Sequence, residues 1–209
     1  MMSDGCRIAL GAPRGVEVAR PFAAYMRHIP SFVTKTSEKK ERGPQMDRLA
    51  RISEVLAPLR AAYPAGFAIA LHFNYAAPKY LFQSYRTDWM DIYSREGLVL
   101  HDPTVRWGLA HTGSVRWSAL DPGDEAGVMA RAAEHGMRFG VALALDTNGS
   151  RSVANFARPD HEVSAPEIAR LGDDLAILHG LTATLETVTP QFHDSLRRMS
   201  IHLTRGPKG

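Results

Sequence analysis

The stretch from Tyr85 to Trp117, YRTDWMDIYSREGLVLHDPTVRWGLAHTGSVRW, decides how the rest of the chain is organised. Its first part carries Tyr85, Trp89 and Tyr93 at intervals of four residues, which predicts one face of a helix. Each ring has an apolar body and one hydrogen-bonding group, so each favours a buried position with a polar partner. The spacing therefore predicts an aromatic helix face that points into the protein.

The second part of the stretch predicts two more elements. Asp102 followed by Pro103, at the start of an apolar-periodic run, predicts the N-cap and first residue of a new helix. Trp117 lies in SVRWSAL, residues 114–120, which has the pattern of a short strand. If the elements converge, they line a mostly aromatic pocket with few polar groups, as small-molecule sites do. Plain core packing and a simple helix cap are the alternatives that spacing leaves open.

The pattern resembles the ligand-binding domain of the LuxR-type quorum-sensing regulators, which bind acyl-homoserine lactones. GMRFGVALAL, residues 136–145, also resembles a strand-opening segment of that family, with Gly140 at its usual glycine. The resemblance covers about residues 46–187. It rests mainly on residues whose order and spacing match the family, namely Tyr85, Trp89, Tyr93, Asp102 with Pro103, and Trp117.

The resemblance implies a role for each of these side chains. Trp89 would donate its indole N–H to the lactone carbonyl, and Asp102 would accept the amide N–H of the ligand. Tyr85 would donate to the amide carbonyl. Trp117 would pack on the lactone ring, and Tyr93 would form a wall beside the acyl chain.

Asn155 is a departure from the family pattern. It lies in SVANFAR, residues 152–158, where the family usually has a small hydroxyl residue that contacts the amide or position 3 of the ligand. Asparagine is larger and carries both a donor and an acceptor. The sequence therefore predicts Asn155 as a ligand contact and leaves the acyl specificity open.

The remaining patterns predict an α+β fold. Asn148-Gly149 predicts a hairpin turn, and Ser164 with Glu167 three residues later predicts a capping box. Strands in antiparallel pairs, with helices before, between and after them, predict an α/β/α sandwich around an antiparallel sheet of about five strands. We expect helices at about 46–63, around Trp89, after Asp102, at 125–135 and at 164–186, and strands at 67–75, 79–85, 114–120, 139–146 and 151–158.

The composition of the chain predicts three segments. Residues 1–45 are interrupted by Gly and Pro and include a charged linker, so we expect a disordered extension. Met46 resembles the usual start of the family, which suggests that the extension is absent from the native protein; an intact mass near 23.0 kDa would refute this. Residues 46–187 form the predicted binding domain. Residues 188–209 resemble the truncated start of a DNA-binding module, or a frayed basic end.

Charge is concentrated at the two ends of the chain. The net charge is +3 in total, but +4 in residues 1–45 and +3 in residues 187–209, so the central part is negative. This central part therefore lacks the net positive charge that is typical of a nucleic-acid-binding domain. The single cysteine, Cys6, excludes an intrachain disulfide and fits a cytoplasmic location. No apolar run reaches the length of a membrane span.

Several functions remain open from the sequence. The first is a lactone sensor without its own DNA-binding module, acting as a homodimer or paired with a full-length regulator through the helix at 164–186. The second is a fragment of such a regulator. A lactone-degrading enzyme is disfavoured, because the nine histidines form no metal-binding motif and no Gly-x-Ser-x-Gly occurs. A different small-molecule or light-sensing module is the last alternative. We expect no cofactor or metal.

Overall fold

The computed structural model describes residues 44–75 and 77–183. The predicted extension and tail therefore lie outside the described residues, apart from the start of the first helix. The described elements are α2 (Pro44–Ala62), β1 (Gly66–Asn74), β2 (Ala77–Gln83), α3 (Thr87–Arg95), α4 (Pro103–Ala110), β3 (Gly113–Arg116), α5 (Val128–Glu134), β4 (Phe139–Thr147), β5 (Ser150–Arg158) and α6 (Ala165–Ala183). Short 3-10 turns lie at Leu98–Leu100, Trp117–Ala119 and Asp121–Gly123.

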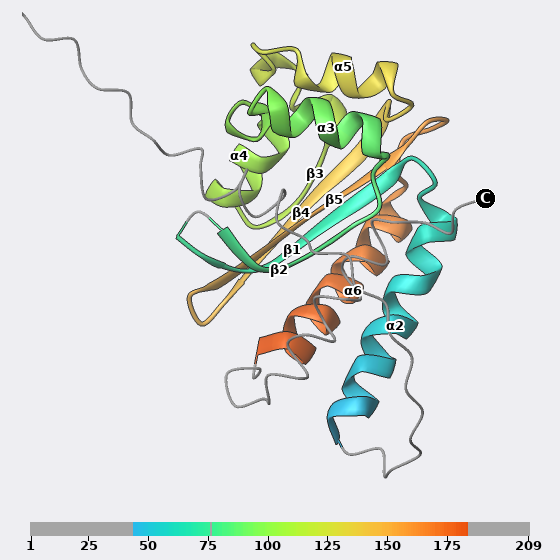
Figure 1. The fold of residues 1–209 in the computed structure, drawn as a ribbon, viewed down its shortest axis with the longest axis vertical. Helices are drawn as coiled ribbons and strands as arrows, with labels where there is room; N and C mark the ends of the chain where they lie inside the picture. The colour runs from blue at the N-terminus through green and yellow to red at the C-terminus, as the bar shows by residue number, and fades with distance from the viewer. Residues whose placement is uncertain (1–43, 76, 184–209) are drawn as a thin grey trace, which may run out of the picture.

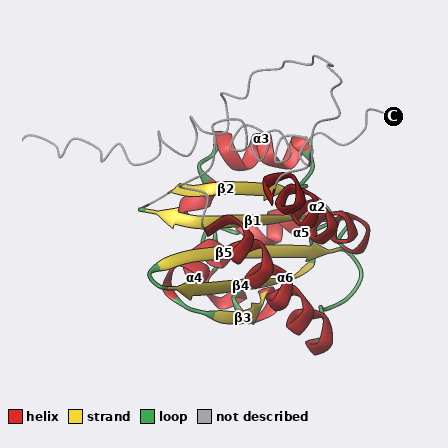
Figure 2. Ribbon diagram, turned by 90° about the horizontal axis from the view of Figure 1, so that it is seen from below, coloured by secondary structure: helices red, strands yellow, loops and turns green. Residues whose placement is uncertain are grey.

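The five described strands form one antiparallel sheet in the order β2-β1-β5-β4-β3 (Figure 2). Helices α2 and α6 lie side by side on one face, while α3, α4 and α5 cover the other (Figure 1). The predicted α/β/α sandwich is confirmed. The order follows from two hairpins, β1-β2 and β4-β5, which join through a β1-β5 pairing.

The two faces of the sheet differ in the size of their side chains. On the α2/α6 face the largest core residues, including Phe67, Phe82 and Phe156, are buried against the helices. On the other face the strands present small residues at matching registers. Ala68 and Ala142 flank Asn155 there, and Gly66 and Gly140 flank Ala157. Because side chains alternate along a strand, large and small residues are sorted onto opposite faces.

The local turn and capping predictions are confirmed. Asp102 caps α4, accepting a hydrogen bond from the backbone N–H of Thr104. Asn148 and Gly149 have φ of 55° and 76°, the positive pair that a two-residue hairpin turn requires. Glu167 accepts hydrogen bonds from the backbone N–H and the hydroxyl of Ser164, which is the glutamate half of the predicted capping box at the start of α6.

Helix α3 begins later than its aromatic spacing predicts. It starts at Thr87, and Arg86 before it has an extended backbone with ψ 144°, so Tyr85 lies outside the helix. The ring of Tyr85 packs on Gly66, where an added Cβ would lie 2.4 Å from a ring carbon. Tertiary packing of Tyr85 against the first residue of β1 thus overrides the four-residue period.

Helix α5 also starts later than predicted, at Val128 instead of residue 125. Its first N–H groups are capped by Asp124, whose two carboxylate oxygens accept from Val128 and Met129 at 2.7 and 2.8 Å. Gly127 has a left-handed backbone with φ 65°, which turns the chain into the helix. The cap therefore lies in the preceding loop.

A buried polar network ties the end of α6 to the sheet. His72 lies at an irregularity of β1 with φ 56°, and its two ring nitrogens lie 2.7 Å from the hydroxyls of Ser150 and Thr182. Ser152 accepts the backbone N–H of His72 and bonds Nδ1 of His179 at 2.8 Å. The two imidazole rings lie 4.4 Å apart. This network connects the end of α6 to β1 and β5.

We predict that the fold loses stability as the pH falls below the ordinary histidine pKa. Burial, helped by His179 and Lys79, lowers the pKa of His72 to about 4. Burial also lowers the pKa of His179, although Asp146 opposes this. The unfolded chain therefore takes up protons first, so the free energy of unfolding should be constant above about pH 7 and fall by roughly 1–2 kcal/mol by about pH 5. Urea unfolding across this range measures it.

Two variants serve as controls for the pH dependence. Replacing His179 by Asn should reduce the slope, whereas replacing the exposed His101 by Asn should leave it unchanged. A free energy of unfolding that does not change, or that rises, as the pH falls would contradict the proposed origin in the His72–His179 pair.

Candidate functional site

A carboxylate joins α3 to α4 at the centre of the predicted site. The hydroxyl of Tyr93, on α3, donates to Oδ2 of Asp102 at 2.8 Å. Oδ1 of Asp102 accepts from the backbone N–H and the hydroxyl of Thr104 at 2.8 and 2.7 Å. The backbone N–H of Val105 also acts on this carboxylate, so donors from Tyr93, Thr104 and Val105 surround Asp102.

Burial controls the electrostatics of these groups. It raises the pKa of Asp102, and the hydrogen bonds from Thr104 and Tyr93 act in the opposite direction. Burial also raises the pKa values of Tyr85 and Tyr93, and the charge of Asp102 adds to the effect. Both phenols are therefore neutral near pH 7 and can act as hydrogen-bond donors.

Tyr85 reaches the same face of the sheet from the loop before α3. Its hydroxyl lies 3.5 Å from the backbone carbonyl oxygen of Asn155 on β5, at the long limit of a hydrogen bond. The prediction that Tyr85 shares a helix with Trp89 and Tyr93 is wrong, but the three rings belong to the same layer between the sheet and the helices, around one cluster of buried residues.

Both predicted tryptophans are buried in this layer. Trp89, on α3, is 4% exposed and its ring lies 5.8 Å from that of Tyr93 and 5.2 Å from that of His135. Trp117 is 6% exposed. It opens the 3-10 turn after β3, so its predicted place within a strand is wrong.

Trp117 leaves the strand because its indole packs flat against β4. A Cβ added at Gly140 would lie 2.5 Å from two carbons of the indole. Only glycine allows the ring to approach the strand this closely. Gly140 and Trp117 therefore form one packing unit, which aligns the indole with the small-residue face of the sheet.

Two buried polar atoms on this face have no hydrogen-bond partner within the described part of the chain. They are the indole Nε1 of Trp117 and the side-chain Oδ1 of Asn155, a residue that is 8% exposed. An unpaired buried donor or acceptor costs free energy, so such atoms are typical of positions completed by a ligand or water. One free donor and one free acceptor thus lie in the same layer as Asp102.

The predictions from the sequence did not include three residues that support these side chains. Thr104 holds the carboxylate of Asp102, His135 covers Trp89, and Gly140 seats Trp117. One signal was present in the sequence. GVALAL, residues 140–145, alternates small and large residues, which indicates a strand with small side chains on one face. No sequence signal placed His135.

Residues 44–75 and 77–183 contain no group of three or more His, Cys, Asp or Glu side chains placed to bind a metal ion. None of the helices described is both long and apolar enough to cross a bilayer.

Residues 61–184 match the family model of the autoinducer binding domain, which is more than half of the 209-residue chain. The chain belongs to the autoinducer-binding domain family. The resemblance to LuxR-type regulators is thereby confirmed, as is the prediction of a binding protein and not an enzyme, because the family consists of ligand-binding regulator domains.

Relatives of the autoinducer-binding domain include the transcriptional activator protein SolR of Ralstonia solanacearum, 29% identical over 106 residues. That match spans 50% of this chain and 45% of SolR. Among solved structures, SdiA of Escherichia coli has a TM-score of 0.50 at 17% identity, covering 78% of this chain and 69% of SdiA. The N-acylhomoserine lactone dependent LuxR family factor CepR2 of Burkholderia cenocepacia has 25% identity and a TM-score of 0.48, covering 67% and 90%.

We predict that Gly140→Ala destabilises the autoinducer-binding domain by about 1–3 kcal/mol, because the new methyl group would overlap the indole of Trp117. The matched control is Gly172→Ala on α6, where the added Cβ would lie 3.8 Å from Leu143. This control should be neutral or stabilising, since alanine favours helices. Chemical denaturation of both variants measures the effect, and equal stabilities would show that Trp117 does not need the glycine.

Proposed function

We propose that this autoinducer-binding domain senses an acyl-homoserine lactone, held between the sheet and helices α3, α4 and α5. The proposal is carried by the Asp102–Tyr93 pair, which lies in the same layer as the unpartnered atoms of Trp117 and Asn155. A ligand of this class offers one amide N–H and two carbonyl acceptors. It therefore supplies a donor for the carboxylate of Asp102, and acceptors for the indole N–H of Trp89 and the hydroxyl of Tyr85.

In this proposal, different residues bind the head group and the acyl chain of the ligand. Trp89, Tyr85 and Asp102 hold the lactone and amide, and Trp117 packs on the ring. The acyl chain lies along the small-residue face of the sheet, beside Tyr93. Each buried methylene contributes about 0.8 kcal/mol, whereas a hydrogen bond to the carboxylate contributes roughly 1.5–3 kcal/mol.

Asp102→Asn should weaken lactone binding by at least an order of magnitude. The amide keeps an oxygen that can cap α4, but it loses the charge that strengthens the hydrogen bond from the ligand. Isothermal calorimetry with a series from butanoyl- to dodecanoyl-homoserine lactone measures the affinity and identifies the preferred chain length.

Asp173→Asn is the matched control, because Asp173 is an exposed carboxylate on α6, beyond the opposite face of the sheet. Its affinity should equal that of the wild type. Circular dichroism on each variant separates a binding defect from unfolding. Unchanged affinity in a folded Asp102→Asn protein would remove Asp102 from the site, and binding of none of the lactones would overturn the proposed ligand.

The second part of the proposal concerns partners: the domain acts as a pair, with a second copy or with a full-length LuxR-type regulator. Helix α6 is the proposed surface, since Ile177 on its outer side is 40% exposed. Sedimentation velocity with and without lactone tests self-association, and adding a full-length regulator tests mixed pairing. A chain that remains monomeric in all of these mixtures would contradict this part alone.

A further inference from the structure

His135 packs against Trp89, one of the residues that the proposed function assigns to the lactone head group. The two rings lie 5.2 Å apart with 47° between their planes, and Tyr93 packs on the same indole from within α3 at 5.8 Å. The side chain of His135 is 25% exposed, whereas Trp89 is 4% exposed. His135 therefore lies at the boundary between the buried indole and solvent.

The end of α5 fixes the backbone of His135. Gly136 has a left-handed backbone with φ 83° and donates its N–H to the carbonyl oxygen of Ala133, while Met137 donates to that of Ala132. These two bonds form a Schellman motif, in which glycine is favoured because it adopts a positive φ without strain. His135 is the last residue before this turn, so the helix end determines where its side chain starts.

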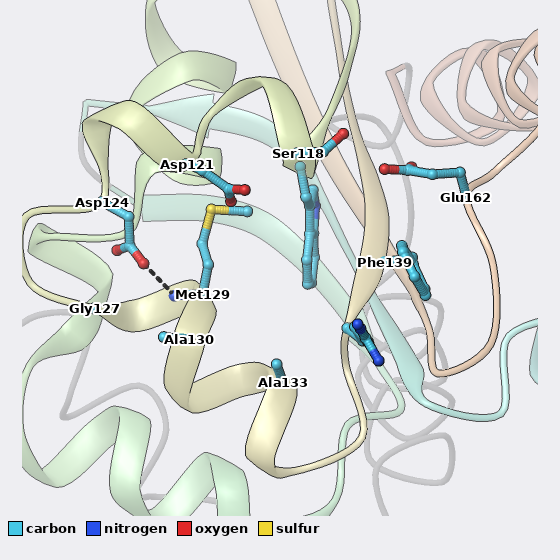
Figure 3. Close-up of a pocket in the computed structure, with 11 residues that line it drawn as sticks. Ser118, Asp121, Asp124, Gly127, Met129, Ala130, Ala133, Phe139 and Glu162 are labelled. Atoms are coloured by element: carbon cyan, nitrogen blue, oxygen red, sulfur yellow. Dashed lines mark hydrogen bonds between the residues drawn. The ribbon is translucent and has the colours of Figure 1, made fainter.

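Polar contacts with α3 hold the end of α5 in place. Arg131 forms an ion pair with Glu96 at 2.8 Å, and Nδ1 of His135 lies 3.9 Å from Oδ2 of Asp88. The first turn of α5 is bound to Asp124, and one side of the helix borders an open pocket of about 470 Å³ (Figure 3). The contacts with α3 therefore determine the position of the end of α5, and with it that of His135.

Asp88 links His135 to the backbone of Trp89. Its Oδ1 accepts the backbone N–H of Trp89 at 2.9 Å, and Arg86 donates to Oδ1 and Oδ2 at 3.1 and 2.7 Å. The hydrogen bond from Arg86, followed by that from Trp89, lowers the pKa of Asp88 to about 2, so this carboxylate is charged near neutral pH. One carboxylate thus lies beside both the residue that carries the indole and the imidazole that packs on it.

We propose that His135 is a positioning residue for lactone binding, an inference that rests on the proposed function. Its ring, together with that of Tyr93, restricts the indole of Trp89, so that the indole N–H keeps a fixed direction toward the lactone carbonyl. It also shields that hydrogen bond from water, and a hydrogen bond is stronger where the surroundings are less polar. His135 therefore strengthens binding of the head group without touching the ligand.

The test compares lactones with ligands that lack the lactone carbonyl. Calorimetry on the full chain uses butanoyl- to dodecanoyl-homoserine lactone and the matching N-cyclopentyl alkanamides, which keep the amide and the chain. His135→Ala should weaken lactone binding roughly three- to tenfold, by the same factor at each chain length, because it removes one aromatic contact of Trp89. The affinity for the cyclopentyl amides should not change. His135→Phe, which restores a ring, should bind the lactones within about twofold of the wild type.

Two further variants make the comparison specific. His135→Asn removes the ring but keeps a polar side chain, and it should show the same contrast between the two ligand series as His135→Ala. The matched control is His111→Ala, because His111 also stacks on a tryptophan, Trp107, at 5.6 Å, but within α4 itself. Its lactone affinity should equal that of the wild type. Circular dichroism verifies that each variant is folded.

Wild-type lactone affinity in the folded His135→Ala or His135→Asn protein would overturn this inference. So would an equal loss of affinity for lactones and cyclopentyl amides, or a loss in His135→Phe as large as in His135→Ala, since the ring would then not act on the head-group hydrogen bond. These results would leave the proposed function intact. Absence of lactone binding by the wild-type chain would overturn both.

Discussion

The carboxylate of Asp102 is the constraint on which the layer between the sheet and helices α3–α5 depends. It caps α4 through Thr104 and receives the hydroxyl of Tyr93 from α3, so one side chain fixes two helices. Burying a carboxylate is costly unless donors surround it. Donors from Tyr93, Thr104 and Val105 do so here, and the position of Tyr93 follows from this requirement.

The sheet separates two kinds of packing. On the α2/α6 side, large side chains form a dense core, and the His72–His179 network holds the end of α6. On the α3–α5 side, the strands present the small residues glycine and alanine, and the aromatic rings come from the helices and loops instead. The α2/α6 face holds the large side chains of the core, whereas the α3–α5 face contains two buried polar atoms, of Trp117 and Asn155, that have no hydrogen-bond partner among the described residues.

Local chemistry explains how much could be predicted from the sequence. The Asp102-Pro103 cap, the Asn148-Gly149 turn and the Ser164–Glu167 box depend on neighbouring residues, and all three form as expected. The alternation along the strands and the period of the helices predicted the sandwich.

The incorrect predictions concern residues whose positions depend on contacts with distant parts of the chain. Tyr85 lies outside helix α3 and packs on Gly66, and Trp117 lies outside strand β3 and packs on Gly140. The hydrogen bond from Tyr93 to Asp102 was missed as well, because no spacing rule joins a helix side chain to the next N-cap.

The most direct test of the central claim is a crystal structure of the chain with a bound acyl-homoserine lactone. The expected result is a lactone between the sheet and helices α3–α5, with its amide nitrogen within hydrogen-bond distance of Oδ2 of Asp102 and its acyl chain on the small-residue face. A ligand bound elsewhere, or a layer in which Asp102 keeps only its partners within the protein, would contradict the claim.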